Sequence, residues 1–221
     1  MNVLIIGASR GIGFEFVRQY RAAGARITAT ARDDAALERL REHGARVLKL
    51  DVADAASVSG LAWQVDGDRF DVVVINAGVF GPRTSGLQTP SAADFDAVMH
   101  TNVLGPMRLL PQVADALAPG ARVAIMSSQM GAITGRSNAT SWLYRASKAA
   151  VNSVMTDAAL ALAGKATVIS FHPGWVRTDM GGAGADIDAA TSVAGMRTVL
   201  ASVKPSDTGR FFNYDGQLLP W

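Results

Sequence analysis

The stretch Val3–Gly13 constrains this chain more than any other part of it. The apolar run Val3–Ile6 is typical of a buried parallel strand, and glycines follow in the spacing G-x-x-x-G-x-G before a helical pattern begins. A strand that turns sharply into a helix directs backbone N–H groups and the positive end of the helix dipole at one point. A pyrophosphate fits there if glycine lets it approach the backbone. The pattern therefore predicts a dinucleotide site built from Gly7, Ser9, Arg10, Gly11, Ile12 and Gly13.

The same loop contains a competing motif. The residues Gly7–Gly11 also match G-x-S-x-G, the nucleophile elbow of α/β-hydrolases. In that fold other strands precede the elbow, whereas here the motif follows the first expected strand. None of the three histidines has an evident oxyanion partner, so the hydrolase interpretation is the weaker one.

Apolar runs alternate with helical patterns along the whole chain. Strands are expected at 3–6, 26–31, 46–50, 71–75, 122–126 and 166–171, with a last candidate at 209–213. Helices are expected after Gly13 and at 33–43, 54–65, 92–117, 141–163 and 189–200. Repeated βαβ units imply an α/β, doubly wound parallel sheet, that is, a Rossmann fold of about seven strands with helices on both faces. We expect a single domain over residues 1–221.

Composition argues against several classes of function. The net charge is only +2 and no basic cluster is visible, so no nucleic-acid partner is expected. The chain has no cysteine and no metal-ligand spacing, so we expect no metal site. No stretch resembles a signal peptide or a bilayer span, so the expected location is cytoplasmic, without membrane association.

The residues after the second expected strand bear on the choice of nucleotide. An acidic residue at its end would bind the ribose 2′-hydroxyl of NAD, but Ala31 and Arg32 stand there. The guanidinium groups of Arg32 and Arg10 suit a 2′-phosphate, so NADP(H) is preferred and NAD(H) is the alternative. Asp51, followed by Val52, ends the third strand, where it either accepts from the adenine amino group or caps a loop.

A tyrosine and a lysine share one face of the helix expected at 141–163. Tyr144 and Lys148 stand at positions i and i+4. A phenol with a pKa of about 10 is a poor base at neutral pH, and a nearby ammonium favours the phenolate. Such a pair can move a proton in carbonyl–alcohol chemistry. In isolation the pair would more often be structural, because neighbours at this spacing are common on helices.

Further motifs accompany the glycine loop and the Tyr144/Lys148 pair. Asn76-Ala77-Gly78 follows the fourth strand, Ser127-Ser128 the fifth and Pro173-Gly174 the sixth, and Asn102 lies in the long helix between them. In this order the motifs resemble the short-chain dehydrogenase/reductase family over nearly the whole chain. The segments 172–182 and 215–221 are similar to the subgroup that contains the carbonyl reductase Sniffer and the bacterial C-factor.

The resemblance implies a role for each motif. Tyr144 would be the general acid/base, Lys148 would hold the nicotinamide ribose and lower the tyrosine pKa, and Ser128 would bind the substrate oxygen. Asn102 would connect Lys148 to solvent through a water molecule. Implied cofactor contacts are Asn76, Ala77 and Gly78 at the adenosine and ribose, together with Pro173, Gly174, Val176 and Thr178, of which the last two contact the carboxamide.

Two loops, near 79–91 and 175–190, are expected to cover the nicotinamide and form the substrate side. No fixed charge for an acidic substrate is obvious there, and the position of Arg136 and Arg177 relative to the pocket is left open. A small apolar or aromatic ketone, aldehyde or quinone is therefore favoured. Ser128 and Tyr144 are sixteen residues apart, so the loop between them must bulge outward if they are to meet. Candidate pocket residues, each with core packing as the alternative, are Phe80, Trp142, Trp175 and Met180.

Pro106 supports a prediction that does not depend on the resemblance. Because proline has no N–H, the carbonyl of Asn102 loses its usual helical partner. We expect a helix kink near Gly105-Pro106 and a water molecule on the Asn102 carbonyl.

The preferred interpretation is an NADP(H)-dependent oxidoreductase acting on a small-molecule carbonyl or alcohol. The alternative is a nucleotide-binding signalling or sensor protein of the C-factor type, which would not need Asn102, Ser128, Tyr144 and Lys148 together. In the resembled family the two long helices pair between subunits, which implies a homodimer or homotetramer.

Overall fold

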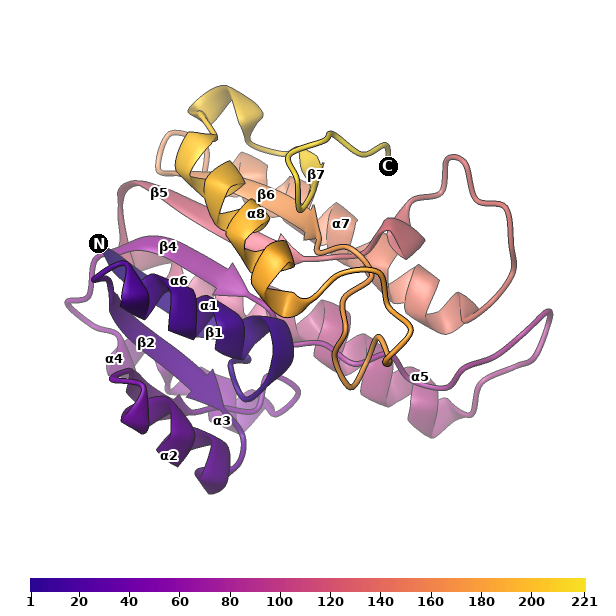
Figure 1. Cartoon of the computed structure of the whole chain (residues 1–221), viewed down its shortest axis with the longest axis horizontal. Helices are drawn as coiled ribbons and strands as arrows, with labels where there is room; N and C mark the ends of the chain where they lie inside the picture. Colours follow the sequence, from indigo (N-terminus) through magenta and orange to yellow (C-terminus); the bar gives the residue numbers. More distant parts are fainter.

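Seven strands form one sheet in which every pairing is parallel, in a computed structural model that describes residues 1–221 (Figure 1). The strand order is β3-β2-β1-β4-β5-β6-β7. The first three strands are added toward one edge of the sheet, and after β3 the chain crosses over to place β4 on the other side of β1. In such sheets ligands bind beyond the carboxyl ends of the strands at this crossover. The strands are β1 Asn2–Ile6, β2 Arg26–Ala31, β3 Arg46–Lys49, β4 Phe70–Ile75, β5 Leu117–Met126, β6 Ala166–His172 and β7 Phe211–Asn213.

Helices cover both faces of the sheet, as Figure 1 shows. Successive strand residues point to opposite faces, so Ile5 packs with the helices α1, α2 and α8, while Ile6 packs with α4, α6 and α7. Both isoleucines are fully buried, which explains why the first strand reads as an uninterrupted apolar run. The helices are α1 Gly11–Ala22, α2 Asp34–Glu42, α3 Ala55–Ser59, α4 Leu61–Gln64, α5 Ala92–Met99, α6 Gly105–Val113, α7 Trp142–Ala161 and α8 Ala189–Ser202, with short 3-10 turns at Ala114–Ala116, Gln129–Gly131 and Pro205–Asp207.

Two expected helices are wrong in detail. The helix expected at 54–65 is divided at Gly60 into α3 and α4, although Asp54 does cap α3 through a bond from the Ala56 N–H (2.9 Å). The helix expected at 92–117 ends with a 3-10 turn, and Leu117 already belongs to β5. The expected interruption at Gly105 is present, but as a π-helical turn, His100–Leu104, in front of it.

Three long connections lie at the carboxyl end of the sheet. Residues 76–91, 132–141 and 173–188 contain no helix and no regular strand, and Figure 1 shows the first two extending well beyond the sheet, before α5 and before α7. The second of them is the outward bulge expected between Ser128 and Tyr144. None of the helices combines the length and the apolar character required to cross a membrane.

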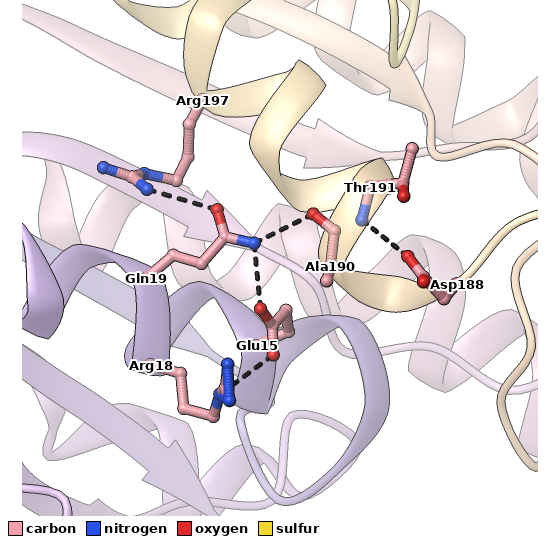
Figure 2. Close-up of polar contacts among 7 residues, drawn as sticks. All are labelled: Glu15, Arg18, Gln19, Asp188, Ala190, Thr191 and Arg197. Carbon is pink, nitrogen blue, oxygen red and sulfur yellow. Dashed lines mark hydrogen bonds and ion pairs between the residues drawn. The ribbon is translucent and has the colours of Figure 1, made fainter.

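A polar network joins the helix of the glycine loop, α1, to α8 (Figure 2). The Gln19 side chain donates to the Ala190 carbonyl (2.9 Å) and to Glu15 Oε1 (2.8 Å), and it accepts from Arg197 Nη1 (3.1 Å). Arg18, which is half exposed, adds an ion pair (3.1 Å) to Glu15, whose side chain is largely buried. Because α8 follows the 173–188 connection directly, Gln19 fixes the end of that connection against the helix that begins at the glycine loop.

We expect Gln19→Ala to lower the free energy of unfolding by about 1–2 kcal/mol, because two hydrogen bonds between α1 and α8 are lost, to the Ala190 carbonyl and from Arg197. Urea denaturation followed by circular dichroism measures this. Arg41→Ala is the matched control, since its i,i+3 ion pair with Glu38 is exposed on both sides and should contribute less than about 0.5 kcal/mol. Equal effects of the two substitutions would show that Gln19 does not connect the helices energetically.

Candidate active site

The glycine loop is held in place by polar contacts from two neighbouring strands. Gly7 adopts a left-handed φ of 87°, its N–H donates to Thr30 Oγ1 (3.0 Å), and its carbonyl accepts from Asn76 Nδ2 (2.7 Å). A Cβ atom added at Gly13 would collide with the Gly7 carbonyl oxygen and the Asn76 side chain. Glycine at both positions therefore lets β1, β4 and α1 meet closely.

A cavity of about 470 Å³ lies over this loop at the carboxyl ends of the central strands. The residues that the sequence analysis assigned to the cofactor line it, with three exceptions. Gly13 lies beneath the loop as described, and Gly174 and Val176 line the neighbouring cavity instead. The predicted residues that do line it are Gly7, Ser9, Arg10, Gly11, Ile12, Arg32, Asp51, Val52, Asn76, Ala77, Gly78, Tyr144, Lys148, Pro173 and Thr178.

Arginines gather at the end of this cavity beside β2. Arg32 lines it and forms no ion pair, whereas Arg10 pairs with Asp179 of the 173–188 connection (2.9 Å). Arg39, which the sequence analysis did not consider, donates to the Ser9 carbonyl (2.9 Å). Thr30 was also missed, although a polar residue facing inward from an apolar strand was a visible signal.

Asp51 lines the same cavity and also stabilises its own loop. Its carboxylate accepts from the Ala53 N–H (3.0 Å), and its own N–H donates to Ser57 Oγ (2.9 Å). The two interpretations that the sequence left open, adenine contact and loop cap, are therefore compatible in this geometry.

Tyr144 and Lys148 project from one face of α7 into the cavity. The Lys148 amine is buried, donates to the Met126 carbonyl (2.9 Å) and lies 5.7 Å from the centroid of the Tyr144 ring. Ser128 begins the turn after β5, where its Oγ accepts from the Met130 N–H (3.1 Å). The neighbouring Ser127 hydroxyl donates instead to the Lys148 carbonyl (3.3 Å), and the Ser128 hydroxyl is the one that approaches the phenol.

Burial dominates the acidity of both groups. It raises the pKa of Tyr144 to about 12, opposed by the Ser128 hydroxyl, and it lowers the pKa of Lys148 to about 8. The pKa of Tyr144 is thus raised by burial, whereas the sequence analysis expected Lys148 to lower it. The phenol is therefore protonated at neutral pH, and the amine titrates close to physiological pH.

Asn102 occupies the π-helical turn and holds the loop above the cavity. Its side chain exchanges two hydrogen bonds of 2.8 Å with the backbone of Val79 and donates to Ser147 Oγ (3.0 Å). The Gly105 N–H bonds to the carbonyl of His100, five residues back, which is the spacing of a π-helix. Asn102 therefore fixes the position of Val79. The water molecule expected to connect Asn102 with Lys148 stays a prediction.

A second cavity, of about 790 Å³, adjoins the first and is lined by Ser128, Phe80, Trp175 and Met180. Trp142 does not line it, which corrects that expectation. It precedes Tyr144 by two residues, about 200° around the helix, so it points away and is 36% exposed. Three arginines line the cavity and no carboxylate does, so the expectation of a site without fixed charge is also wrong. They are Arg83, Arg136 and Arg145.

His172 lies in the wall of this second cavity. Burial lowers its pKa to about 4, with Asp215 opposing the shift, so the imidazole is neutral at pH 7. Its Nδ1 atom is buried without a hydrogen-bond partner.

Comparisons with known proteins agree with this geometry. A family model described as short chain dehydrogenase matches residues 1–186. The protein C-signal of Myxococcus xanthus is 41% identical over 157 residues, covering 68% of this chain and 92% of its own length. The carbonyl reductase Sniffer of D. melanogaster superposes with a TM-score of 0.92 at 26% identity, and a short-chain dehydrogenase/reductase from Burkholderia multivorans with bound NADP superposes with a TM-score of 0.90 at 31% identity. Both structures cover 100% of this chain and are themselves covered to 99%.

Proposed function

Because the chain belongs to the short-chain dehydrogenase family, we propose that it is an NADP(H)-dependent carbonyl reductase that interconverts a carbonyl compound and its alcohol. A bound nicotinamide supplies or accepts the hydride. The protein's own residues bind the reactants, orient them and move the proton.

The arrangement of Tyr144 carries this proposal, because Tyr144 lines both cavities. Lys148 lines only the first cavity, and Ser128 lines only the second. A substrate in the second cavity therefore meets a cofactor in the first beside the phenol. In reduction the Ser128 hydroxyl donates a hydrogen bond to the carbonyl oxygen, and Tyr144 donates its proton to that oxygen as negative charge develops there.

The residues of the first cavity fit a dinucleotide phosphate. The glycine loop and the amino end of α1 offer backbone N–H groups for the pyrophosphate. Arg32, which has no carboxylate partner, is suited to a 2′-phosphate, and Arg10 can add a second guanidinium by exchanging its exposed pair with Asp179. These features support NADP(H) over NAD(H).

Oxidation of NADPH against a panel of aldehydes, ketones and quinones tests the proposal. We expect turnover of at least one class, followed at the nicotinamide absorbance. The relative named C-signal supports a second candidate, a nucleotide-binding signalling protein. Tight NADPH binding without turnover of any carbonyl would favour that candidate and contradict the reductase.

The pKa values predict a pH profile for carbonyl reduction. The phenol stays protonated up to about pH 12, so its proton is available throughout the physiological range. The Lys148 amine is charged below about pH 8 and neutral above it, and its charge beside the Tyr144 ring favours the phenolate that forms when the proton is given up, so kcat should fall as pH rises through 8. In Lys148→Arg the charge persists, and this inflection should disappear. A rate that increases from pH 6 to 9 in the unmodified protein would contradict the assignment.

A further inference from the structure

The second cavity has a charge that the reduction of a carbonyl does not itself require. Arg83, Arg136 and Arg145 line it, and it contains no aspartate or glutamate. The one histidine in its wall is His172, which is neutral at pH 7. The cavity thus contains three positive charges and no negative side chain.

Arg83 is held beside the proposed acid by stacked side chains. The Phe80 ring stacks on the Tyr144 ring with centroids 4.4 Å apart, and the Arg83 guanidinium carbon lies 4.6 Å from the Phe80 centroid. Arg83 also donates to the Met180 carbonyl (2.9 Å), so it spans from the 76–91 connection to the 173–188 connection. Its charge is fixed one aromatic ring away from the phenol.

Arg145 and Arg136 provide charge from the other side of the cavity. Arg145 is only 8% exposed and is fixed by bonds to the Thr140 carbonyl (2.8 Å) and to Asn138 Oδ1 (2.6 Å). Both of these acceptors are neutral. Burial and the nearby Arg136 guanidinium lower the pKa of Arg145, as expected for cations that face each other without a counter-ion.

The segments that carry these arginines, the 76–91 connection on one side and the 132–141 connection with the start of α7 on the other, are joined to each other. The Ser141 N–H donates to the Thr84 carbonyl (2.8 Å), which ties the residue after Arg83 to the start of α7. Ser141 itself makes no side-chain cap for this helix, so the positive end of a 20-residue helix faces the same region.

None of the three arginines lies within ion-pairing distance of a carboxylate elsewhere in the chain. They line a different cavity from Arg10 and Arg32, so the cofactor phosphates do not account for them. Unneutralised guanidinium groups in a concave site attract anions and form forked, charge-assisted bonds with them.

We propose that the substrate of the second cavity is a carbonyl compound carrying an anionic group, of which a carboxylate is the simplest, bound by Arg83, Arg136 and Arg145 while its carbonyl oxygen meets Ser128 and Tyr144. This rests on the proposed reductase function and adds the chemical class of the substrate. It replaces the apolar ketone or quinone favoured from the sequence.

A matched pair of aldehydes tests the proposal with the full chain. 4-Carboxybenzaldehyde and methyl 4-formylbenzoate present the same ring and aldehyde with and without a negative charge. With saturating NADPH we expect kcat/KM to be at least about tenfold higher for the acid, mainly through KM, because charge-assisted bonds form only with it. The preference should shrink when the salt is raised to about 0.5 M.

Arg83→Gln and Arg136→Gln should each lower the ratio of acid to ester by about threefold to tenfold. Arg145 is left intact because its bonds hold the loop. Arg69→Gln is the control, since Arg69 is exposed, bonds only to a backbone carbonyl and lines neither cavity. An equal or greater kcat/KM for the ester would overturn the proposal.

Calorimetric binding of the two aldehydes to the protein with NADP⁺ separates this proposal from the reductase function. Selective binding of the acid that is weakened in the arginine variants, without turnover of either aldehyde, would support the anionic site and reject the reductase. Turnover of both aldehydes without selective binding of the acid would retain the reductase and reject the anionic site.

Discussion

Tyr144→Phe is expected to lower kcat for carbonyl reduction by about a thousandfold, the typical contribution of a positioned general acid. The substitution removes only the hydroxyl group. The Phe80 stack at 4.4 Å and the burial of the ring are kept, so the shape of both cavities should persist. Since hydride transfer leaves negative charge on the substrate oxygen, loss of the proton donor acts on the transition state.

Cofactor binding provides the control for this prediction. The Kd for NADPH, from fluorescence titration, should change by less than about threefold, because the glycine loop and Arg32 are untouched. Ser128→Ala should also reduce kcat, by about tenfold to a hundredfold, since it removes one hydrogen bond to the oxygen. Full activity of Tyr144→Phe would mean that the proton comes from another group.

Arg32→Gln is expected to lower kcat/KM for NADPH by about fiftyfold and to leave kcat/KM for NADH nearly unchanged. One charge-assisted bond to a phosphate contributes about 1.5–3 kcal/mol, which corresponds to this range. Arg32 lines the cavity and forms no ion pair in the protein, so a phosphate does not have to displace a carboxylate from it. The measurement is steady-state kinetics with each cofactor at a fixed carbonyl concentration.

Arg10→Gln separates the two guanidinium groups. Arg10 is paired with Asp179, so part of its interaction with a phosphate is offset by the loss of that pair, and its effect should be smaller than that of Arg32. An equal loss of kcat/KM for both cofactors in Arg32→Gln would show that Arg32 contacts a part they share, and would remove the argument for NADP(H).

The strand and helix pattern was predictable because it depends on neighbours along the chain. The run Val3–Ile6 and the close glycines determine β1, its turn and α1, and Tyr144 and Lys148 share a face because one helical turn separates them. The position of Trp142 was open to the same argument, since helix geometry alone places it away from Tyr144. The division at Gly60 and the π-helical turn were not, because packing selects among local alternatives of similar energy.

The sequence by itself determined the parallel fold, the site for a dinucleotide and the pairing of Tyr144 with Lys148. The fold follows from the alternation of strand and helix patterns along the chain, and the glycine loop and the Tyr144/Lys148 pair follow from backbone geometry over a few residues. Only the tertiary structure decided that burial raises the tyrosine pKa and that Arg83, Arg136 and Arg145 share one cavity. Desolvation and electrostatic potential depend on groups that are distant in the chain and become neighbours only when the loops fold over the sheet.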